Sequence, residues 1–215
     1  MRTCLFDVDG TLVDSGRPIL SSLNAALAVH DQAPITGDDL WRHVGPPLHD
    51  TLSALLAERG GDLNQVGQLI DSYRDHYSAT SVAMARSYEG IPELLGQLAG
   101  RVRLGVVTSK PLPYARPILE TLGFAALMEV IEGPNLDEME PKVETLARAL
   151  GRLHGEDPVG TVMIGDRRHD IEAARVNGIS SIGVTWGFGA SEELIEAGAD
   201  HIVDDPGRLG ELLGI

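Results

Sequence analysis

Two aspartates, Asp7 and Asp9, stand two residues apart at the end of a short apolar run, in FDVDGTLVDS. Aspartate is depleted in strands, and like charges so close together repel each other, so an ordinary turn does not explain the pair. Side chains two residues apart in a strand point to the same side, and a bound divalent cation would remove their repulsion. The pair therefore predicts a metal site presented by a strand over residues 4–8.

Two other stretches carry groups that suit a phosphoryl group. Thr108 and Ser109 follow the apolar run in VRLGVVTS, where their hydroxyl and backbone N–H groups could hold a phosphate oxygen or serve as a helix cap. Lys142 follows Pro141 at the expected start of a helix. A cation there opposes the helix dipole unless an anion binds beside it, although a surface position would also suit a lysine.

A second acidic pair, Asp166 and Asp170, lies in MIGDRRHD. Asp166 ends an apolar run and is predicted to be a further metal ligand. Asp170 is predicted to be the N-cap of a helix that begins at Ile171 and to lie behind the metal site. These acids, hydroxyl groups and lysine are consistent with a single site if the fold brings their segments together.

The pattern of apolar segments predicts how that happens. Nearly continuous apolar runs alternate with amphipathic stretches, which indicates a doubly wound parallel sheet with helices on both faces. Right-handed connections place the carboxyl ends of all such strands at one edge, where ligands bind. The expected strands are 4–8, 102–109, 128–133, 161–166, 181–187 and 201–205, and the expected helices are 91–99, 113–122, 141–153, 170–177 and 191–197.

The segment between about residues 15 and 84 has a different period. Its apolar residues recur at helical spacing over 18–30, 46–58 and 63–85, and it contains no convincing strand. We therefore predict an α/β core domain from residues 1–14 and 85–215, with an all-helical domain, 15–84, inserted after the first strand.

The composition of the chain limits the classes of partner that it is expected to bind. The chain has 215 residues, with 32 acidic against 17 basic side chains and a net charge of −15, which argues against a nucleic acid polymer as the main partner. The single cysteine, Cys4, cannot form a disulfide within the chain, as is usual in a reducing cytoplasm. With neither a signal peptide nor an apolar stretch long enough to cross a membrane, we expect a cytoplasmic protein. Its oligomeric state is not predicted.

Four stretches together resemble the haloacid dehalogenase superfamily of phosphohydrolases: FDVDGTLVDS, VVTSK, Lys142 in its PKVETLARAL context and MIGDRRHDIEAARVNG. The resemblance implies a Rossmann-like α/β core with a helical cap that closes over the site. Weaker features, such as GPPL at 45–48, favour the branch of phosphoglycolate phosphatase-like and 5′-nucleotidase-like members. Two departures are Pro141 before Lys142, where many relatives have proline after the lysine, and Glu89 where proline is common.

The resemblance also implies roles for the residues of the site. Asp7 would be the nucleophile that forms an aspartyl-phosphate, and Asp9 would be the acid and base. Mg²⁺ would bind to Asp7, Asp166 and the backbone carbonyl of Asp9. The residues that would bind the phosphoryl group or support the site are Thr108, Ser109, Lys142 and Asp170.

The expected function is that of a Mg²⁺-dependent phosphatase acting on a small phosphorylated metabolite such as phosphoglycolate. A 5′-nucleotidase or a phosphomutase would carry the same motifs. A receiver-type phosphorylation switch is disfavoured, because receiver domains lack a helical insertion and place the phosphorylated aspartate on a central strand. A dehalogenase is disfavoured by Asp9 and Asp166, since that reaction needs no metal and usually lacks the second acid.

Overall fold

The computed structural model describes residues 2–36, 43–44, 47–136, 140–154 and 158–215. The chain forms two compact units, one of Met1–Asp14 with Arg86–Ile215 and the other of Ser15–Ala85. Gly45 and Pro46 of the GPPL stretch lie outside the described residues. Among the helices described, none combines the length and the apolar character needed to cross a membrane.

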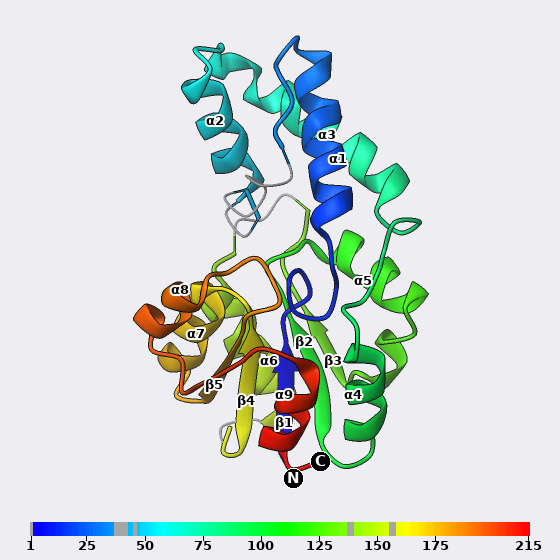
Figure 1. Cartoon of the computed structure of the whole chain (residues 1–215), viewed down its shortest axis with the longest axis vertical. Helices are drawn as coiled ribbons and strands as arrows, with labels where there is room; N and C mark the ends of the chain where they lie inside the picture. The colour runs from blue at the N-terminus through cyan, green and yellow to red at the C-terminus, as the bar shows by residue number, and fades with distance from the viewer. Residues whose placement is uncertain (1, 37–42, 45–46, 137–139, 155–157) are drawn as a thin grey trace. The chain divides into compact units, whose positions relative to one another are not determined.

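The larger unit is built on a six-stranded sheet in the order β3-β2-β1-β4-β5-β6, in which every neighbouring pair is parallel (Figure 1). Buried, β-branched and other apolar residues dominate the central strands, as expected for a sheet covered on both faces. The strands are β1 (Thr3–Phe6), β2 (Arg103–Val107), β3 (Val130–Glu132), β4 (Thr161–Gly165), β5 (Ser180–Val184) and β6 (His201–Val203).

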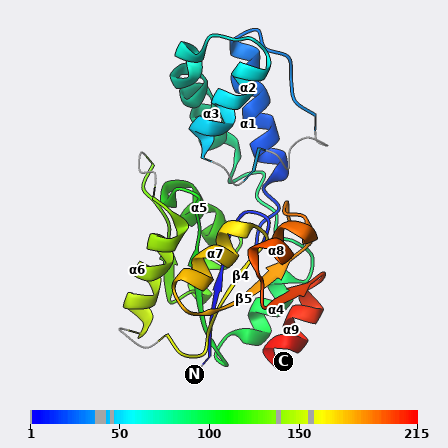
Figure 2. The ribbon, with the colours of Figure 1, turned by 90° about the vertical axis from the view of Figure 1, so that its left-hand side faces the viewer.

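Helices connect the strands and lie on both faces of the sheet (Figure 2). Helices α6 and α7 pack together and α7 packs against α8, while α4 packs against α9. The helices of this unit are α4 (Ile91–Leu98), α5 (Leu112–Thr121), α6 (Lys142–His154), α7 (Arg168–Val176), α8 (Ser191–Ala197) and α9 (Pro206–Leu213). The predicted doubly wound α/β class with an inserted helical unit is therefore confirmed.

The register of the sheet determines which residues meet at its carboxyl edge. Phe6 of β1 pairs with Val106 on one side and Ile164 on the other, so these three strands end at nearly the same level. The strand order reverses between β1 and β4, which is the point where doubly wound sheets bind ligands.

Two local predictions differ from the structure. Strand β1 ends at Phe6, and the chain turns at Val8, where backbone N–H groups of Thr11, Leu12 and Val13 converge on the Val8 carbonyl. Helix α9 was not predicted, because it has only eight residues, of which two are glycine. Its start could have been found from Asp205 before Pro206: the Asp205 carboxylate accepts the Arg208 N–H at 2.9 Å.

In the part of the smaller unit that the structure describes, the α-helices are α1 (Gly16–Val29), α2 (Leu48–Glu58) and α3 (Val66–Thr80). Helix α1 packs against α3 through the predicted apolar stripes, which bury Leu23, Leu27 and Leu69. The segment after α1 is held to it by the Asn24 amide, which donates to the Ile35 carbonyl at 3.1 Å and accepts the Ile35 N–H at 2.8 Å.

Cys4 lies in the middle of β1 and is completely buried. Burial raises the pKa of its thiol to about 12, against a smaller opposite effect of Arg2, so the thiol stays protonated at neutral pH. It is a core residue, as buried free cysteines usually are.

Candidate active site

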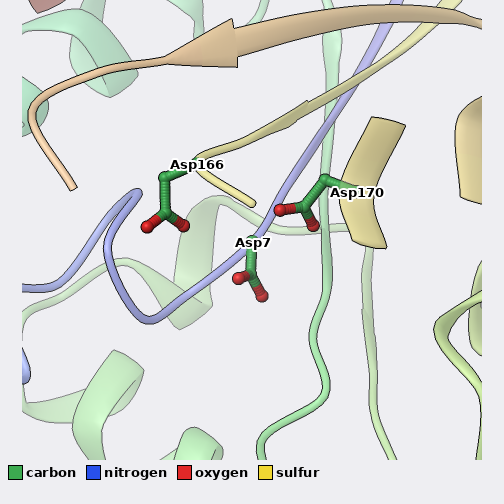
Figure 3. Close-up of side chains that lie close together, drawn as sticks. All are labelled: Asp7, Asp166 and Asp170. Carbon is green, nitrogen blue, oxygen red and sulfur yellow. The ribbon is translucent and has the colours of Figure 1, made fainter. Parts of the chain in front are cut away.

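Three buried carboxylates meet at the carboxyl edge of the sheet (Figure 3). Asp7 directly follows β1, Asp166 directly follows β4, and Asp170 is in the first turn of α7. One oxygen from each carboxylate lies within 4.8 Å of the other two. The strand ends therefore bring together residues that are up to 163 positions apart in the sequence, as the parallel sheet predicts.

Asp166 is fully buried and held at both oxygens. Its Oδ2 accepts the backbone N–H of Phe188 at 2.8 Å, and its Oδ1 accepts the Thr11 hydroxyl at 3.3 Å. Burial raises the pKa of Asp166 to about 8, and the nearby carboxylates of Asp170 and Asp7 act in the same direction. The side chain is thus fixed in orientation but strained electrostatically.

Glycines allow the backbone to approach Asp166 closely. Gly10 has φ = 81°, and a Cβ atom there would collide with the Asp166 carboxylate. A Cβ atom on Gly187 would collide with both the Gly10 carbonyl and Asp166. These two positions therefore require glycine, because no side chain fits between the turn after β1 and the loop after β5.

Lys142, the first residue of α6, bridges two of the three acids. Its Nζ lies 2.9 Å from Asp7 Oδ1 and also forms an ion pair with Asp170. Burial alone would lower the pKa of Lys142, but the carboxylates of Asp170 and Asp7 together raise it above its ordinary value. For Asp7, burial raises the pKa to about 6, although Lys142 acts against the rise.

Asp170 supports Lys142, but not as the predicted N-cap. Helix α7 begins at Arg168, three residues before the predicted start at Ile171, which makes Asp170 its third residue. The Asp170 carboxylate accepts the backbone N–H of Arg167 at 3.0 Å and closes the first turn from inside the helix. Because Asp170 is fully buried, this contact also fixes the acid that pairs with Lys142.

The residues of this cluster fit a hard divalent cation. All of the side-chain donors are carboxylate oxygens, which Mg²⁺ prefers, and three carboxylates face a single lysine. Burial is the main reason why the pKa values of Asp7 and Asp166 are raised, and the neighbouring carboxylates add to the rise. A cation beside Asp7 and Asp166 would supply the missing positive charge.

Asp9 is not in the group of three carboxylates that share oxygens within 4.8 Å of one another, although its charge acts on Asp7 and contributes to the raised pKa of Asp7. Because β1 ends at Phe6, strand alternation does not extend to Asp9. The Asp9 carboxylate lies against Lys110, whose Nζ is 3.0 Å from Oδ1 and 3.0 Å from Oδ2. The two acids of the motif are thus paired with two different lysines.

Lys110 is not among the site residues predicted from the sequence, although it belongs to the VVTSK stretch. Its side chain is buried, with 5% exposed, and reaches an acid 101 residues away. One signal could have identified it: Lys110 and Lys142 are the only lysines of the chain, while the other 15 basic residues are arginines. Both lysines lie at the candidate site.

Thr108 and Ser109 follow β2 at the same edge of the sheet. Thr108 is buried, and its hydroxyl accepts the backbone N–H of Lys110 at 3.1 Å, so it shapes the turn that carries the lysine. Ser109 is exposed at this turn. Of the two residues predicted to bind phosphate through their hydroxyl groups, Ser109 is therefore exposed, whereas the Thr108 hydroxyl has a contact within the turn.

Comparison with known proteins identifies the family to which this chain is similar. Residues 4–184 match the model of haloacid dehalogenase-like hydrolases. A tyrosine-protein kinase PtkA of Mycobacterium tuberculosis is 41% identical over 211 residues, which cover 97% of this chain and 70% of that protein. A 5′-nucleotidase of Pseudomonas aeruginosa is 37% identical over 97% of this chain and 94% of its own length.

Phosphatases are similar to this chain both in sequence and in structure. A phosphoglycolate phosphatase of Agrobacterium fabrum is 33% identical over 94% of this chain and 87% of that protein. The crystal structure of a predicted phosphatase from Clostridium acetobutylicum has a TM-score of 0.88 and 34% identity, and the match covers 99% of this chain and 97% of that one. The resemblance of the four sequence stretches to this group of hydrolases is confirmed.

Proposed function

The chain belongs to the haloacid dehalogenase-like hydrolase family, and on that premise we propose that it is a Mg²⁺-dependent phosphatase that hydrolyses a small phosphate monoester through an aspartyl-phosphate on Asp7. The observation that carries the proposal is the buried cluster of Asp7, Asp166 and Asp170, in which, among the described residues, Lys142 is the cation that forms ion pairs with two of these acids. Such a cluster is costly unless cations or charged ligands complete it.

Asp7 suits the role of nucleophile. It is buried at the end of β1, and its pKa of about 6 leaves the carboxylate largely ionised at neutral pH. Attack of a carboxylate oxygen on phosphorus breaks the bond to the ester oxygen and leaves the phosphoryl group on Asp7. Hydrolysis of that acyl phosphate by water then releases phosphate and restores the carboxylate.

The other residues divide the remaining tasks. The carboxylates of Asp7 and Asp166 and the backbone carbonyl of Asp9 would hold Mg²⁺, which would supply positive charge to the phosphoryl oxygens. Lys142, held by Asp170, contributes a second positive charge, and Ser109 and Thr108 orient the group. Asp9 protonates the leaving oxygen and then takes a proton from the attacking water.

We propose a small phosphorylated metabolite as the substrate, with phosphoglycolate as the first compound to test. The phosphoglycolate phosphatase and the 5′-nucleotidase found by sequence comparison support compounds of this size and make nucleoside monophosphates the alternative. A phosphomutase would use the same residues but would return the phosphoryl group to the organic molecule.

A second candidate function is phosphoryl transfer to tyrosine. The relative named tyrosine-protein kinase supports it, and the chain matches 70% of that protein. The second step differs in the acceptor, because a phosphoryl group on Asp7 would pass to a tyrosine hydroxyl instead of water. The two functions make different demands on the donor, since the kinase needs a nucleoside triphosphate.

The deciding experiment is a screen of phosphate monoesters with phosphate release as the readout. The purified chain is incubated with phosphoglycolate, nucleoside monophosphates and sugar phosphates in MgCl₂, and in parallel with EDTA. We expect phosphate release that depends on Mg²⁺ and is absent from the Asp7→Asn variant. Release of an isomeric phosphate ester would instead indicate a mutase, and no activity on any compound would overturn the proposal.

The kinase alternative is tested in the same preparation with γ-labelled ATP and a tyrosine-containing peptide. Label in the peptide that is absent with Asp7→Asn would favour the kinase. Label released only as inorganic phosphate would favour the phosphatase.

A further inference from the structure

The chain uses lysine at only two positions, and both of these lysines are buried among the acids of the candidate site. Lys142 has a place in the proposed mechanism, but Lys110 does not. The other 15 basic residues of the chain are arginines, and among the residues that the structure describes none of them is buried. A buried lysine offers a compact charge on a slender stem.

The position of Lys110 is fixed by its own backbone. The Thr108 hydroxyl accepts the Lys110 N–H at 3.1 Å, and a Cβ atom on Gly133 would lie only 2.8 Å from the Lys110 carbonyl oxygen. The turn after β2 is therefore packed tightly against the segment after β3. From this turn the side chain reaches Asp9, with Nζ at 3.0 Å from each carboxylate oxygen.

The two lysines form ion pairs with three of the four acids of the site. Lys142 holds Asp7 and Asp170, and among the described residues the group of acids close enough to share a cation consists of these two and Asp166. Asp9 is outside that group, although it is only two residues from Asp7. Its carboxylate is 20% exposed and faces Lys110 instead.

We propose that Lys110 is a positioning residue that keeps the Asp9 carboxylate out of the cation site and available to the leaving oxygen of the substrate; this inference rests on the proposed function. A free carboxylate this close to Asp7 would be attracted to a divalent cation, because carboxylate oxygens are the ligands that such cations prefer. A carboxylate bound to the cation could no longer exchange a proton with the substrate. Lys110 prevents this by holding the Asp9 carboxylate outside the group formed by Asp7, Asp166 and Asp170.

The first test is a double-mutant cycle on phosphate release, with Lys110→Met, Asp9→Asn and the double variant. Methionine keeps an unbranched stem of similar length, so that the change removes mainly the charge. We expect Lys110→Met to lower kcat by about 10- to 100-fold with little change in KM, and to have no further effect in the Asp9→Asn background.

Two variants control for charge and for the lysine itself. Arg168→Met removes one positive charge from an exposed pair with Glu172, 3.0 Å away, and is expected to leave kcat unchanged. Lys110→Arg restores the charge and is expected to recover part of the lost activity. Independent, multiplicative effects of Lys110→Met and Asp9→Asn, or a raised KM with unchanged kcat, would overturn the proposal, because Lys110 would then act on the substrate or on the fold.

The second test measures cation binding without turnover. Titration calorimetry with MgCl₂ alone compares the wild type with Lys110→Met. We expect the variant to bind Mg²⁺ about tenfold more tightly, because Asp9 becomes free to join the site and one positive charge is lost. Equal or weaker binding would overturn the proposal, whatever the activity. If the wild type releases no phosphate but Lys110→Met still binds Mg²⁺ more tightly than the wild type, the proposed function is refuted and the effect of Lys110 on Asp9 still stands.

A third measurement needs no variant at position 110 and covers the case in which Lys110→Met does not fold. Because the chain has two lysines, protein with isotope-labelled lysine gives two side-chain NMR signals. In Asp9→Asn we expect the Lys110 signal to move strongly and the Lys142 signal to move little. In the wild type MgCl₂ should displace mainly the Lys142 signal. A Lys110 signal that responds to Mg²⁺ as strongly as that of Lys142 would contradict the proposal.

Discussion

The α/β unit contains two groups of buried charge that are balanced in different ways. At the carboxyl edge of the sheet, the carboxylates of Asp7, Asp166 and Asp170 face one lysine. The pKa of Asp7 rises to about 6 and that of Asp166 to about 8. This group carries more negative charge than the chain itself neutralises.

The second group lies at the end of β3 and is matched. Glu132, with 3% of its side chain exposed, contacts Arg148 Nε at 2.7 Å and Arg152 Nη1 at 2.5 Å. Arg148 also contacts Glu140 at 2.5 Å, and its pKa is raised by hydrogen bonds to Glu140 and Glu132. Two carboxylates face two guanidinium groups. The comparison indicates that a buried acid with its full complement of cations supports the fold, whereas a deficit of cations marks a place for a ligand.

The largest effect that distinguishes the two groups is expected from Asp7→Asn. Loss of the nucleophile should lower kcat by at least about 10⁴-fold, because an amide cannot form the acyl phosphate. The melting temperature of the metal-free protein should not fall, since the substitution removes one unbalanced charge. Phosphate release and thermal unfolding measure the two results, and a variant with more than a tenth of the wild-type kcat would refute the role of Asp7.

Asp166→Asn should act on the cation rather than on the fold. We expect Mg²⁺ affinity to drop by about 100-fold in calorimetry, since a carboxylate ligand is replaced by a neutral amide. Glu172→Gln, on the exposed part of α7, is the matched control and should bind Mg²⁺ like the wild type. An Asp166→Asn variant with unchanged Mg²⁺ affinity would show that Asp166 does not bind the cation.

The two groups should also differ in their response to pH. The folded-state pKa values of Asp7 and Asp166 lie above the ordinary value, so the protonated forms favour the folded state. Their contribution to stability is fully present below pH 4 and is lost as the pH rises through 6 and then 8. Between pH 5 and 9 the metal-free protein should lose roughly 5 kcal/mol of unfolding free energy, at about 1.4 kcal/mol for each pH unit between pH 5 and the raised pKa of each group.

Denaturant unfolding across this pH range, with and without MgCl₂, measures the effect. Bound Mg²⁺ should flatten the dependence, because the cation replaces the protons in compensating for the carboxylates. The Asp166→Asn variant should show a shallower decline without Mg²⁺. Stability that rises with pH in the metal-free wild type would contradict the charge deficit at the carboxyl edge.

Glu132→Gln should produce the smallest effect and only on the fold. The substitution leaves Arg148 and Arg152 without their shared carboxylate, but both are partly exposed and can be solvated. We expect a loss of about 1–3 kcal/mol in unfolding free energy, with the kcat of the folded protein unchanged. A large fall in kcat without a fall in stability would mean that the matched group also serves the reaction.

The sequence was informative where the signal was local or followed from topology. Asp7, Thr108, Ser109 and Asp166 were placed at one edge because each follows an apolar run, and a parallel sheet aligns such ends. Lys142 was placed by its position at the start of a helix. None of these steps required knowing how the side chains pair.

The rest depended on contacts between distant segments. The contact between Asp9 and Lys110 joins the turn after β1 to the turn after β2, and no periodicity predicts it. Because β1 ends at Phe6 and the backbone turns at Val8, strand alternation does not determine where the Asp9 carboxylate lies. The support of Asp166 by the Phe188 N–H depends on a loop 22 residues further along the chain. Such pairings follow from the folded geometry and leave only compositional traces, such as the use of lysine at two positions.

The buried thiol of Cys4 has a practical consequence for optical work on this chain. Since this thiol is inaccessible and stays protonated at neutral pH, thiol-reactive dyes will not label it in the folded protein. A cysteine introduced at Val29 in the helical unit, or at Val159 in the α/β unit, would stand at a position that is 69% or 81% exposed. With both in place, a donor and acceptor fluorophore could be attached without removing the native cysteine, and energy transfer between them would report the distance between the two units during turnover.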